Sequence, residues 1–152
     1  MQKFSTWLEA MFNKDTSNLE GEPYMDVEWK GTNPYQEPQA KMLVLKIIYR
    51  WKGYSILPHQ KGYAKPDEFA NIELHQLYEH PEYFYMDAIS VADPFQREGY
   101  ATDLVKKALE LIKGKGFKGI LSGVDDRTQN ASALWKSLKP RRVGEYDVYD
   151  SI

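Results

Sequence analysis

The stretch from Val91 to Ala101 holds the residues best suited to bind an anion. It reads V-A-D-P-F-Q-R-E-G-Y-A and lies between an apolar segment and an amphipathic one. A helix start offers about four backbone N–H groups without helical partners, and the helix dipole adds roughly half a positive charge there. Gly99 has no side chain to keep an anion away from these amides, and Ala101 keeps the first turn narrow. The pattern therefore predicts a pyrophosphate site between a strand and a helix.

At these residues the chain resembles the GNAT (N-acetyltransferase) superfamily. The family signature is Gln or Arg, two residues, Gly, one residue, and then Gly or Ala, which Gln96, Gly99 and Ala101 match. Val91 is apolar, as the family favours at that distance before the signature, whereas the usual proline falls one place late, at Pro94. A glycine before a helix more often serves only a tight turn, but together with Gln96, Ala101 and the downstream Ala133-Leu134-Trp135 it favours an acyl-CoA site.

A looser match to the same family lies downstream. Asn130 opens a predicted helix and precedes the triplet Ala133-Leu134-Trp135, where the family has Asn and then Ala-Leu-Tyr. The Asn stands closer to the triplet than is usual, and the family's Gly-Phe ending is absent. The resemblance extends roughly from Tyr83 to Tyr149.

The resemblance implies acetyl-CoA as the cosubstrate. Its pantetheine arm would pair with the backbone of one strand, Tyr83–Val91, in a cleft where that strand separates from the next, Phe117–Val124. Its pyrophosphate would bind to amides of the turn and of the first helical residues. The cofactor-binding residues expected on this basis are Ile89, Val91, Gln96, Arg97, Glu98, Gly99, Tyr100, Ala101, Thr102 and Asn130.

The reaction that the resemblance implies is direct attack of an amine on the thioester, which needs a base for the amine proton and an acid for the leaving thiolate. Trp135 stands where the family has its usual acid, a Tyr, and an indole is no useful proton donor to a thiolate. Tyr146 or Tyr149 on the last strand is the expected substitute. Asp87, four residues before Val91, is the expected base, unless it is only a strand residue that pairs with a neighbour or faces solvent.

The composition restricts the classes of function. The chain has 152 residues, 42% hydrophobic and 28% charged, which suits one globular domain over residues 1–152. A net charge of −2 disfavours a nucleic-acid partner and weakly favours a cationic acceptor. The absence of cysteine excludes disulfides and thiolate ligands, and His59, His75 and His80 lack metal-ligand spacing, so no metal is expected. No apolar run is long enough to cross a bilayer and no signal peptide is visible, so no membrane association and a cytoplasmic location are expected.

Hydrophobic periodicity predicts the elements that must position these residues. Residues 1–14 are expected to form an amphipathic helix, either docked on the domain or used to bind a partner. Strands that form a mostly antiparallel meander are expected at Tyr24–Lys30, Met42–Trp51, Tyr54–Leu57, Ile72–Tyr78 and Tyr83–Val91.

The second half of the chain alternates helices and strands. Elements are expected at Tyr100–Lys113 (helix), Phe117–Val124 (strand), Asn130–Leu138 (helix) and Val143–Tyr149 (strand). A strand, a helix and a strand in this order imply a right-handed parallel crossover. The predicted fold is therefore α/β and GNAT-like: a mixed, mostly antiparallel sheet flanked by helices, with the N-terminal helix added. Because the chain ends soon after Tyr149, the family's last strand is expected to be absent or borrowed from a second copy of the chain in a homodimer.

The leading interpretation is transfer of an acetyl group from acetyl-CoA to a primary amine on a small molecule or a protein. An alternative is a non-catalytic GNAT-like protein that binds CoA or a protein partner and has lost the acid at Trp135. A third is an interaction protein that keeps only the fold and uses its N-terminal helix as the contact surface.

Overall fold

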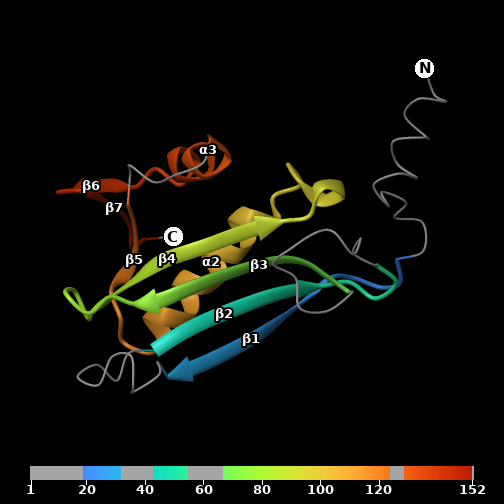
Figure 1. Cartoon of the computed structure of the whole chain (residues 1–152), viewed down its shortest axis with the longest axis horizontal. Helices are drawn as coiled ribbons and strands as arrows, with labels where there is room; N and C mark the ends of the chain where they lie inside the picture. Colours follow the sequence, from blue (N-terminus) through green and yellow to red (C-terminus); the bar gives the residue numbers. More distant parts are fainter. Residues whose placement is uncertain (1–18, 32–42, 55–66, 124–128, 152) are drawn as a thin grey trace.

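The computed structural model describes residues 19–31, 43–54, 67–123 and 129–151. In these ranges the chain forms a seven-stranded sheet, shown face-on in Figure 1. In spatial order the strands are β1 (Tyr24–Gly31), β2 (Leu43–Arg50), β3 (Glu68–Gln76), β4 (Tyr83–Val91), β5 (Gly119–Gly123), β7 (Tyr146–Tyr149) and β6 (Arg141–Val143). Neighbours are antiparallel except β4 and β5, which are parallel. The mixed, mostly antiparallel sheet predicted from the sequence is confirmed.

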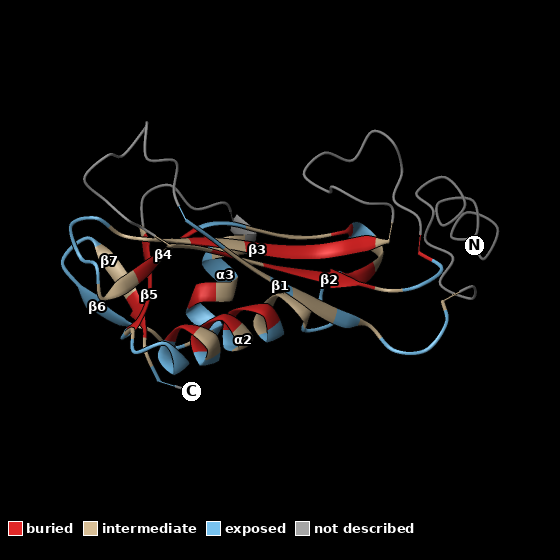
Figure 2. Ribbon diagram, turned by 90° about the horizontal axis from the view of Figure 1, so that it is seen from below, coloured by how far each residue is buried: buried red, intermediate tan, exposed pale blue. Residues whose placement is uncertain are grey.

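Two α-helices of the described chain, α2 (Tyr100–Gly114) and α3 (Gln129–Ser137), lie on the same side of the sheet (Figure 2). A short 3₁₀ helix, η1 (Asp93–Phe95), precedes α2. Neither α2 nor α3 has the length and apolar character needed to cross a membrane. Residues 1–14, where a helix was expected, lie outside the described part of the chain.

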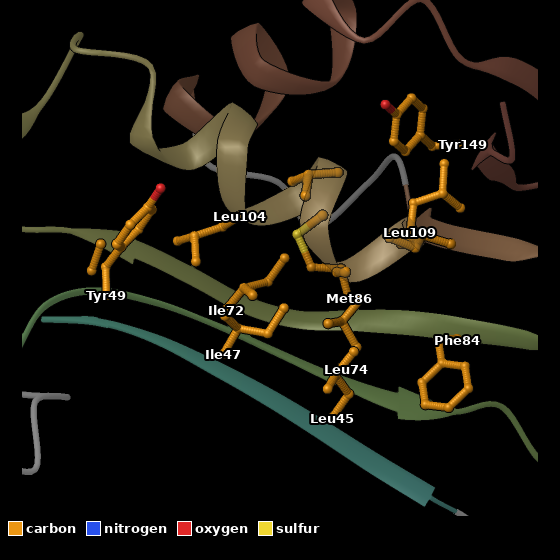
Figure 3. Packing of buried hydrophobic residues seen from close by; sticks show 14 of the residues in the cluster. Leu45, Ile47, Tyr49, Ile72, Leu74, Phe84, Met86, Leu104, Leu109 and Tyr149 are labelled. Atoms are coloured by element: carbon orange, nitrogen blue, oxygen red, sulfur yellow. The ribbon is translucent and has the colours of Figure 1, made fainter. Parts of the chain in front are cut away.

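The hydrophobic core lies between α2 and the sheet. Apolar residues of α2 recur every three or four positions, so they share one face of the helix, and that face is buried. It meets alternate residues of the strands, which point to the same side because a strand has a period of two. Figure 3 shows this contact. The fully buried members include Leu45, Ile47, Ile72, Leu74, Phe84, Leu104, Leu109 and Ile112. Each such side chain stabilises the fold by about 1.5–3 kcal/mol relative to an exposed position.

A β-bulge interrupts β4. Glu73 of β3 lies opposite Ala88 and Leu74 lies opposite Met86, so Asp87 is an extra residue with no partner of its own in the register. The bulge shifts the alternation of side chains by one position. As a result Ile89, opposite Ile72, faces α2. In a regular strand of the same residues it would point to the other side, which we call the outer face.

The pairing between β4 and β5 is short. It covers Tyr83–Tyr85 against Gly119–Leu121 and then stops. Beyond Tyr85, β4 continues to Val91 along β3, while β5 continues to Gly123 along β7. The two parallel strands therefore diverge (Figure 1), which agrees with the separation expected from the sequence.

The C-terminal region corrects the sequence prediction. One strand was expected at Val143–Tyr149, but the chain forms two, β6 and β7, joined by a turn in which Gly144 has φ of 61°. Glycine adopts this left-handed backbone without a steric penalty, so it reverses the chain where the apolar pattern suggested continuity. Because β7 pairs with β5, the last strand is neither absent nor borrowed from a second copy.

Other boundaries differ less. β3 begins four residues before the expected Ile72, and β5 is shorter than the expected Phe117–Val124. The turn expected at Lys52-Gly53 is present, with the Tyr54 amide donating to the Trp51 carbonyl at 3.1 Å. Tyr54 is not part of a strand, and the rest of the strand expected there lies outside the described residues.

Candidate functional site

The turn from β4 into α2 is shaped by two residues with left-handed backbone. Arg97 has φ of 65° and Gly99 has φ of 89°. Gly99 is the N-cap of α2, and no side chain caps the helix there. For a residue with a Cβ the left-handed region is strained, and such strain often accompanies a binding site. The turn therefore combines an open helix start with a backbone that only a few residue types adopt easily.

Two side chains hold this turn in place. Phe95 of η1 is buried at 3% exposure, and its ring lies 4.5 Å from the ring of Phe69. Gln96 donates from Nε2 to the Val91 carbonyl at 3.0 Å and to Asp93 Oδ1 at 3.1 Å. The Gln96 amide thus ties the turn to the end of β4.

Backbone amides at the start of α2 are available to an anion. The first helical hydrogen bond runs from the Asp103 amide to the Gly99 carbonyl at 3.0 Å. The amides of Tyr100, Ala101 and Thr102 come earlier, so they have no carbonyl one turn back to pair with. A Cβ placed on Gly99 would meet no atom within 4 Å, and Gly99, Tyr100, Ala101 and Thr102 all line a cavity. Geometry and dipole together suit a phosphate group.

A cavity of about 610 Å³ opens at this helix start. Ligand sites for molecules of moderate size commonly have volumes of this order. The end of β4, the turn with the start of α2, and α3 each supply part of the wall. The lining residues are Ile89, Ser90, Val91, Phe95, Gln96, Arg97, Gly99, Tyr100, Ala101, Thr102, Ala131, Ala133 and Leu134.

Two tyrosines beside the turn keep their protons to higher pH than usual. Burial raises the pKa of Tyr49 and the negative charge of Asp103 raises it further; a hydrogen bond joins the two side chains. Burial also raises the pKa of Tyr100, with Glu98 adding to the effect. Both phenols are therefore neutral at physiological pH and place no negative charge near the helix start.

Four titratable side chains form a row on the outer face, opposite the cavity side of the sheet. His75 of β3 contacts Asp87 of the bulge, with 2.5 Å between His75 Nδ1 and Asp87 Oδ2. The ring of Tyr85 lies 5.7 Å from that of His75 and 6.3 Å from that of Tyr146 on β7. We call His75, Asp87, Tyr85 and Tyr146 the outer-face row.

The outer-face row crosses the sheet where β4 and β5 separate. A Cβ on Gly123 of β5 would lie 2.9 Å from the Tyr85 hydroxyl, so this phenol reaches over the neighbouring strand. Burial raises the pKa of Tyr146, and the nearby Glu145 raises it further, which keeps that phenol protonated. The row thus contains a carboxylate, an imidazole and two phenols, which are the groups that acid–base catalysis uses.

Most residues expected from the sequence to bind the cofactor line the cavity. They are Ile89, Val91, Gln96, Arg97, Gly99, Tyr100, Ala101 and Thr102. Glu98 is exposed and is not among the lining residues. Asn130 belongs to α3, whose Ala131 also lines the cavity, but the Asn130 side chain lies outside the described part of the structure.

The expected catalytic residues Asp87 and Tyr146 lie outside the cavity but together in the outer-face row. Tyr149, the other expected acid, is buried in the core at 5% exposure. Trp135, at the family's acid position, is 1% exposed and likewise belongs to the core.

Sequence reasoning missed His75 and Tyr85, because strand pairing alone brings them beside Asp87. A sequence signal for the bulge does exist. Apolar residues of β4 stand at even positions up to Met86 and at odd positions from Ile89 onward, which indicates one extra residue between them.

Comparison with known proteins agrees with this geometry. A sequence profile of the Acetyltransferase (GNAT) family matches residues 24–139. No match to a curated protein is found by sequence. A solved structure of the AtaT mutant toxin, bound to the C-terminus of the antitoxin AtaR, is similar with a TM-score of 0.55 and 10% identity, over 86% of this chain and 92% of that chain.

Two further structures have lower TM-scores. An N-acetyltransferase from Staphylococcus aureus Mu50 gives a TM-score of 0.49 at 12% identity, over 76% of this chain and 67% of that chain. An IAA acetyltransferase from Bacillus cereus ATCC 14579 gives 0.44 at 19% identity, over 75% of each chain. At sequence identities of 10–19%, structural similarity indicates a shared fold and does not indicate a shared function. The family rests on the sequence profile, which covers most of the chain and its cavity-lining residues: this chain belongs to the GNAT acetyltransferase family.

Proposed function

We propose that this protein transfers an acetyl group from acetyl-CoA to a primary amine by direct attack. The observation that carries the proposal is the single cavity wall formed by the end of β4, the open start of α2 and one face of α3. Membership of an acetyltransferase family supports the same reaction class. The family match over residues 24–139 favours one acetyltransferase domain.

In this proposal the two ends of the cosubstrate bind to different parts of the cavity wall. The pyrophosphate takes the amides of Tyr100, Ala101 and Thr102, where the helix dipole favours negative charge. The pantetheine arm follows β4 along Ile89 and Val91, whose edge no longer pairs with β5. The thioester then reaches the place where the two strands separate.

The reaction also needs a base for the amine and an acid for the thiolate. Asp87 and Tyr146 remain the proposed groups for these two roles. Both belong to the outer-face row, so the acceptor amine would approach from the side of the sheet opposite α2. The raised pKa of Tyr146 suits an acid that must hold its proton at neutral pH.

Trp135 favours one alternative function. Its indole is buried in the core, so the position where the family has its acid contributes no proton donor to the cavity. A GNAT-like protein of this kind would bind CoA or a protein partner without transferring the acetyl group. The two functions differ in product formation and share the cosubstrate.

The first experiment is thermal unfolding of the full chain with and without acetyl-CoA. A ligand at about 100 times its dissociation constant adds about 2.7 kcal/mol to the free energy of unfolding. For a chain of this size the unfolding temperature then rises by roughly 5–10 °C. A set of primary amines, with release of free CoA as the readout, follows.

The outcomes separate the candidate functions. A thermal shift together with CoA release supports the transferase. A shift without product from any amine supports the non-catalytic CoA-binding protein. If millimolar acetyl-CoA leaves the unfolding temperature unchanged, the cavity does not bind this cosubstrate, and an interaction protein that keeps only the fold becomes the better account.

A further inference from the structure

We propose that His75 is the base that takes the proton from the acceptor amine, and that Asp87 is a positioning residue that acts through it. This inference rests on the acetyl-transfer function proposed above, and it replaces Asp87 by His75 as the proton acceptor. It is carried by a contact between two strands that the sequence alone does not display.

The contact depends on the bulge in β4. Tyr85, and not Asp87, is the residue of β4 that lies opposite His75 in the strand register. The extra residue at the bulge brings the Asp87 carboxylate to the outer face, where its Oδ2 lies 2.5 Å from His75 Nδ1. The side chains of His75 and Asp87 are 36% and 38% exposed, so an incoming amine can reach the pair.

The pair fixes which ring nitrogen accepts a proton. A carboxylate can only accept hydrogen bonds, so His75 Nδ1 must carry the hydrogen that Asp87 accepts. The lone pair of the neutral imidazole is then on Nε2. Asp87 holds the ring in this tautomer and stabilises the imidazolium that forms, as an orienting carboxylate does in other acid–base pairs.

At neutral pH the imidazole of His75 is also a better base than the carboxylate of Asp87. Reference pKa values are about 6.5 for histidine and about 3.9 for aspartate. A base works best when its pKa is near the working pH, because it is then both unprotonated and strong enough to accept a proton. At neutral pH this condition favours an imidazole over a carboxylate.

The position of the pair relative to the cavity fits this role. Ile89, which lines the cavity, is two residues beyond Asp87 on β4, a distance of about 7 Å along a strand. The cavity lies on the α2 side and the pair on the outer face, and the β4–β5 pairing that would separate them ends at Tyr85. An acceptor amine that approaches from the outer face beyond Tyr85 would therefore come toward both the His75–Asp87 pair and a thioester placed between β4 and β5.

The proposed step is balanced. The amine nitrogen attacks the thioester carbonyl carbon, the new C–N bond forms and the C–S bond breaks. One amine proton passes to His75 Nε2 and from there to solvent. The CoA thiolate takes one proton from the acid, and the products are an N-acetyl amide and free CoA.

Other charged groups on this face bear on the titration of His75. Titratable groups that share this face of the sheet are Glu28 and Lys30 of β1, Lys46 of β2, Glu73 of β3, Tyr85 and Asp87 of β4 and Tyr146 of β7. The Asp87 carboxylate contacts the ring at 2.5 Å, so we expect its removal to have a large effect on the imidazole.

The test uses three variants of the full chain with an amine found in the screen. We expect His75→Gln to lower kcat by about 10²–10⁴-fold, the usual contribution of a general base, and to leave the thermal shift by acetyl-CoA intact. Lys106→Gln is the control, because Lys106 is exposed on α2 and belongs neither to the cavity lining nor to the outer-face row. It should leave kcat unchanged.

The pH profile distinguishes the base from its positioning residue. In the native chain kcat/KM rises with pH as the base loses its proton. Asp87→Asn removes a negative charge beside the imidazole and should shift this rise to lower pH, with a lower plateau, because an adjacent negative charge raises the pKa of a cation. Asp87→Glu restores the charge and should return the rise toward its native position. His75→Gln should abolish the rise.

Each result supports or overturns the inference. If His75→Gln keeps the native kcat and pH profile while Asp87→Asn loses the rise, Asp87 is itself the base and the inference is wrong. If the native chain acetylates no amine although it binds acetyl-CoA, the proposed function fails, and the role of His75 fails with it. A native chain that is active beside an equally active His75→Gln overturns the inference alone.

Discussion

The helix start that faces the cavity and the outer-face row are built in opposite ways. The first is local: the turn from Asp93 to Thr102 brings backbone amides together within ten consecutive residues. The second is assembled from three strands, with His75 on β3, Asp87 on β4 and Tyr146 on β7. In the proposed function, one region would bind through its main chain, and the other would react through its side chains.

This difference determines how each region responds to substitution. A site made of amides tolerates most changes of side chain, because every residue carries the same N–H group. It is vulnerable where backbone shape or open space requires glycine. A row of titratable groups is vulnerable at each member, and also at any neighbour that moves one of them.

The largest effect is expected at Gly99. Gly99 lines the cavity at the helix start, so a Trp there would place a bulky side chain in the cavity wall, and we expect Gly99→Trp to weaken acetyl-CoA binding by more than about 100-fold, or about 2.7 kcal/mol. Gly116→Trp is the matched control, because Gly116 has a similar φ of 95°, against 89° at Gly99, and a Cβ there also meets no atom within 4 Å.

Both variants carry the same kind of backbone strain, so both should unfold at a lower temperature. Only Gly99→Trp should lose affinity, measured by calorimetric titration with acetyl-CoA. Equal affinities in the two variants would mean that the pyrophosphate binds elsewhere.

A smaller effect is expected at Gly123, and it examines the outer-face row. A Cβ there would lie 2.9 Å from the Tyr85 hydroxyl, which must then shift. Because a misplacement of this size at a reacting group can cost up to about 100-fold, we expect Gly123→Ala to lower kcat by about 10- to 100-fold with little change in cosubstrate affinity. Gly114→Ala, at the end of α2 and with no atom within 4 Å of its Cβ, is the control.

Steady-state kinetics at saturating acetyl-CoA measures this change. An unaltered kcat in Gly123→Ala would remove Tyr85 from the reacting part of the row and leave only the His75–Asp87 pair.

The smallest effect concerns alkaline stability at the helix start. Burial and Asp103 raise the pKa of Tyr49 in the folded state, so above pH 10 the unfolded chain loses this proton before the folded chain does. The stabilisation is complete below about pH 10 and is lost as the pH rises through the folded pKa, by at most about 1.4 kcal/mol per pH unit.

Tyr49→Phe should therefore flatten the fall of the urea midpoint between about pH 9.5 and 11.5. The exposed Tyr24, at 47% exposure, provides the control Tyr24→Phe, which should keep the native slope. An unchanged slope in Tyr49→Phe would show that Tyr49 does not govern the alkaline limit.

The same contrast explains what the sequence could predict. The order β4, turn, α2, β5 and α3 was predictable because apolar periodicity and the Gln96–Ala101 spacing are local signals. Of the ten residues expected to bind the cofactor, eight line the cavity, which reflects the local nature of that site.

The remaining features depend on pairing between distant segments. The two strands at the C-terminus were predicted as one, since Val143 and Tyr146 continue an apolar pattern and only the turn at Gly144 separates them. The contact between His75 and Asp87 needs both the register of β3 against β4 and the bulge, and neither is fixed by residues close in sequence. The shift of apolar residues from even positions up to Met86 to odd positions from Ile89 indicates the bulge in the sequence. It does not indicate which residue of β3 lies beside Asp87.

The bulge has a consequence for how such a protein can evolve. Deleting a single codon from an ordinary strand turns every following side chain to the opposite face. In β4 the loss of the codon for Asp87 would instead leave a regular strand, with Ala88 still opposite Glu73 and Ile89 still opposite Ile72. The lineage could thus discard the carboxylate in one mutational event and keep its cofactor cavity. A single codon therefore separates this outer face from one in which the imidazole of His75 lacks the carboxylate that orients it.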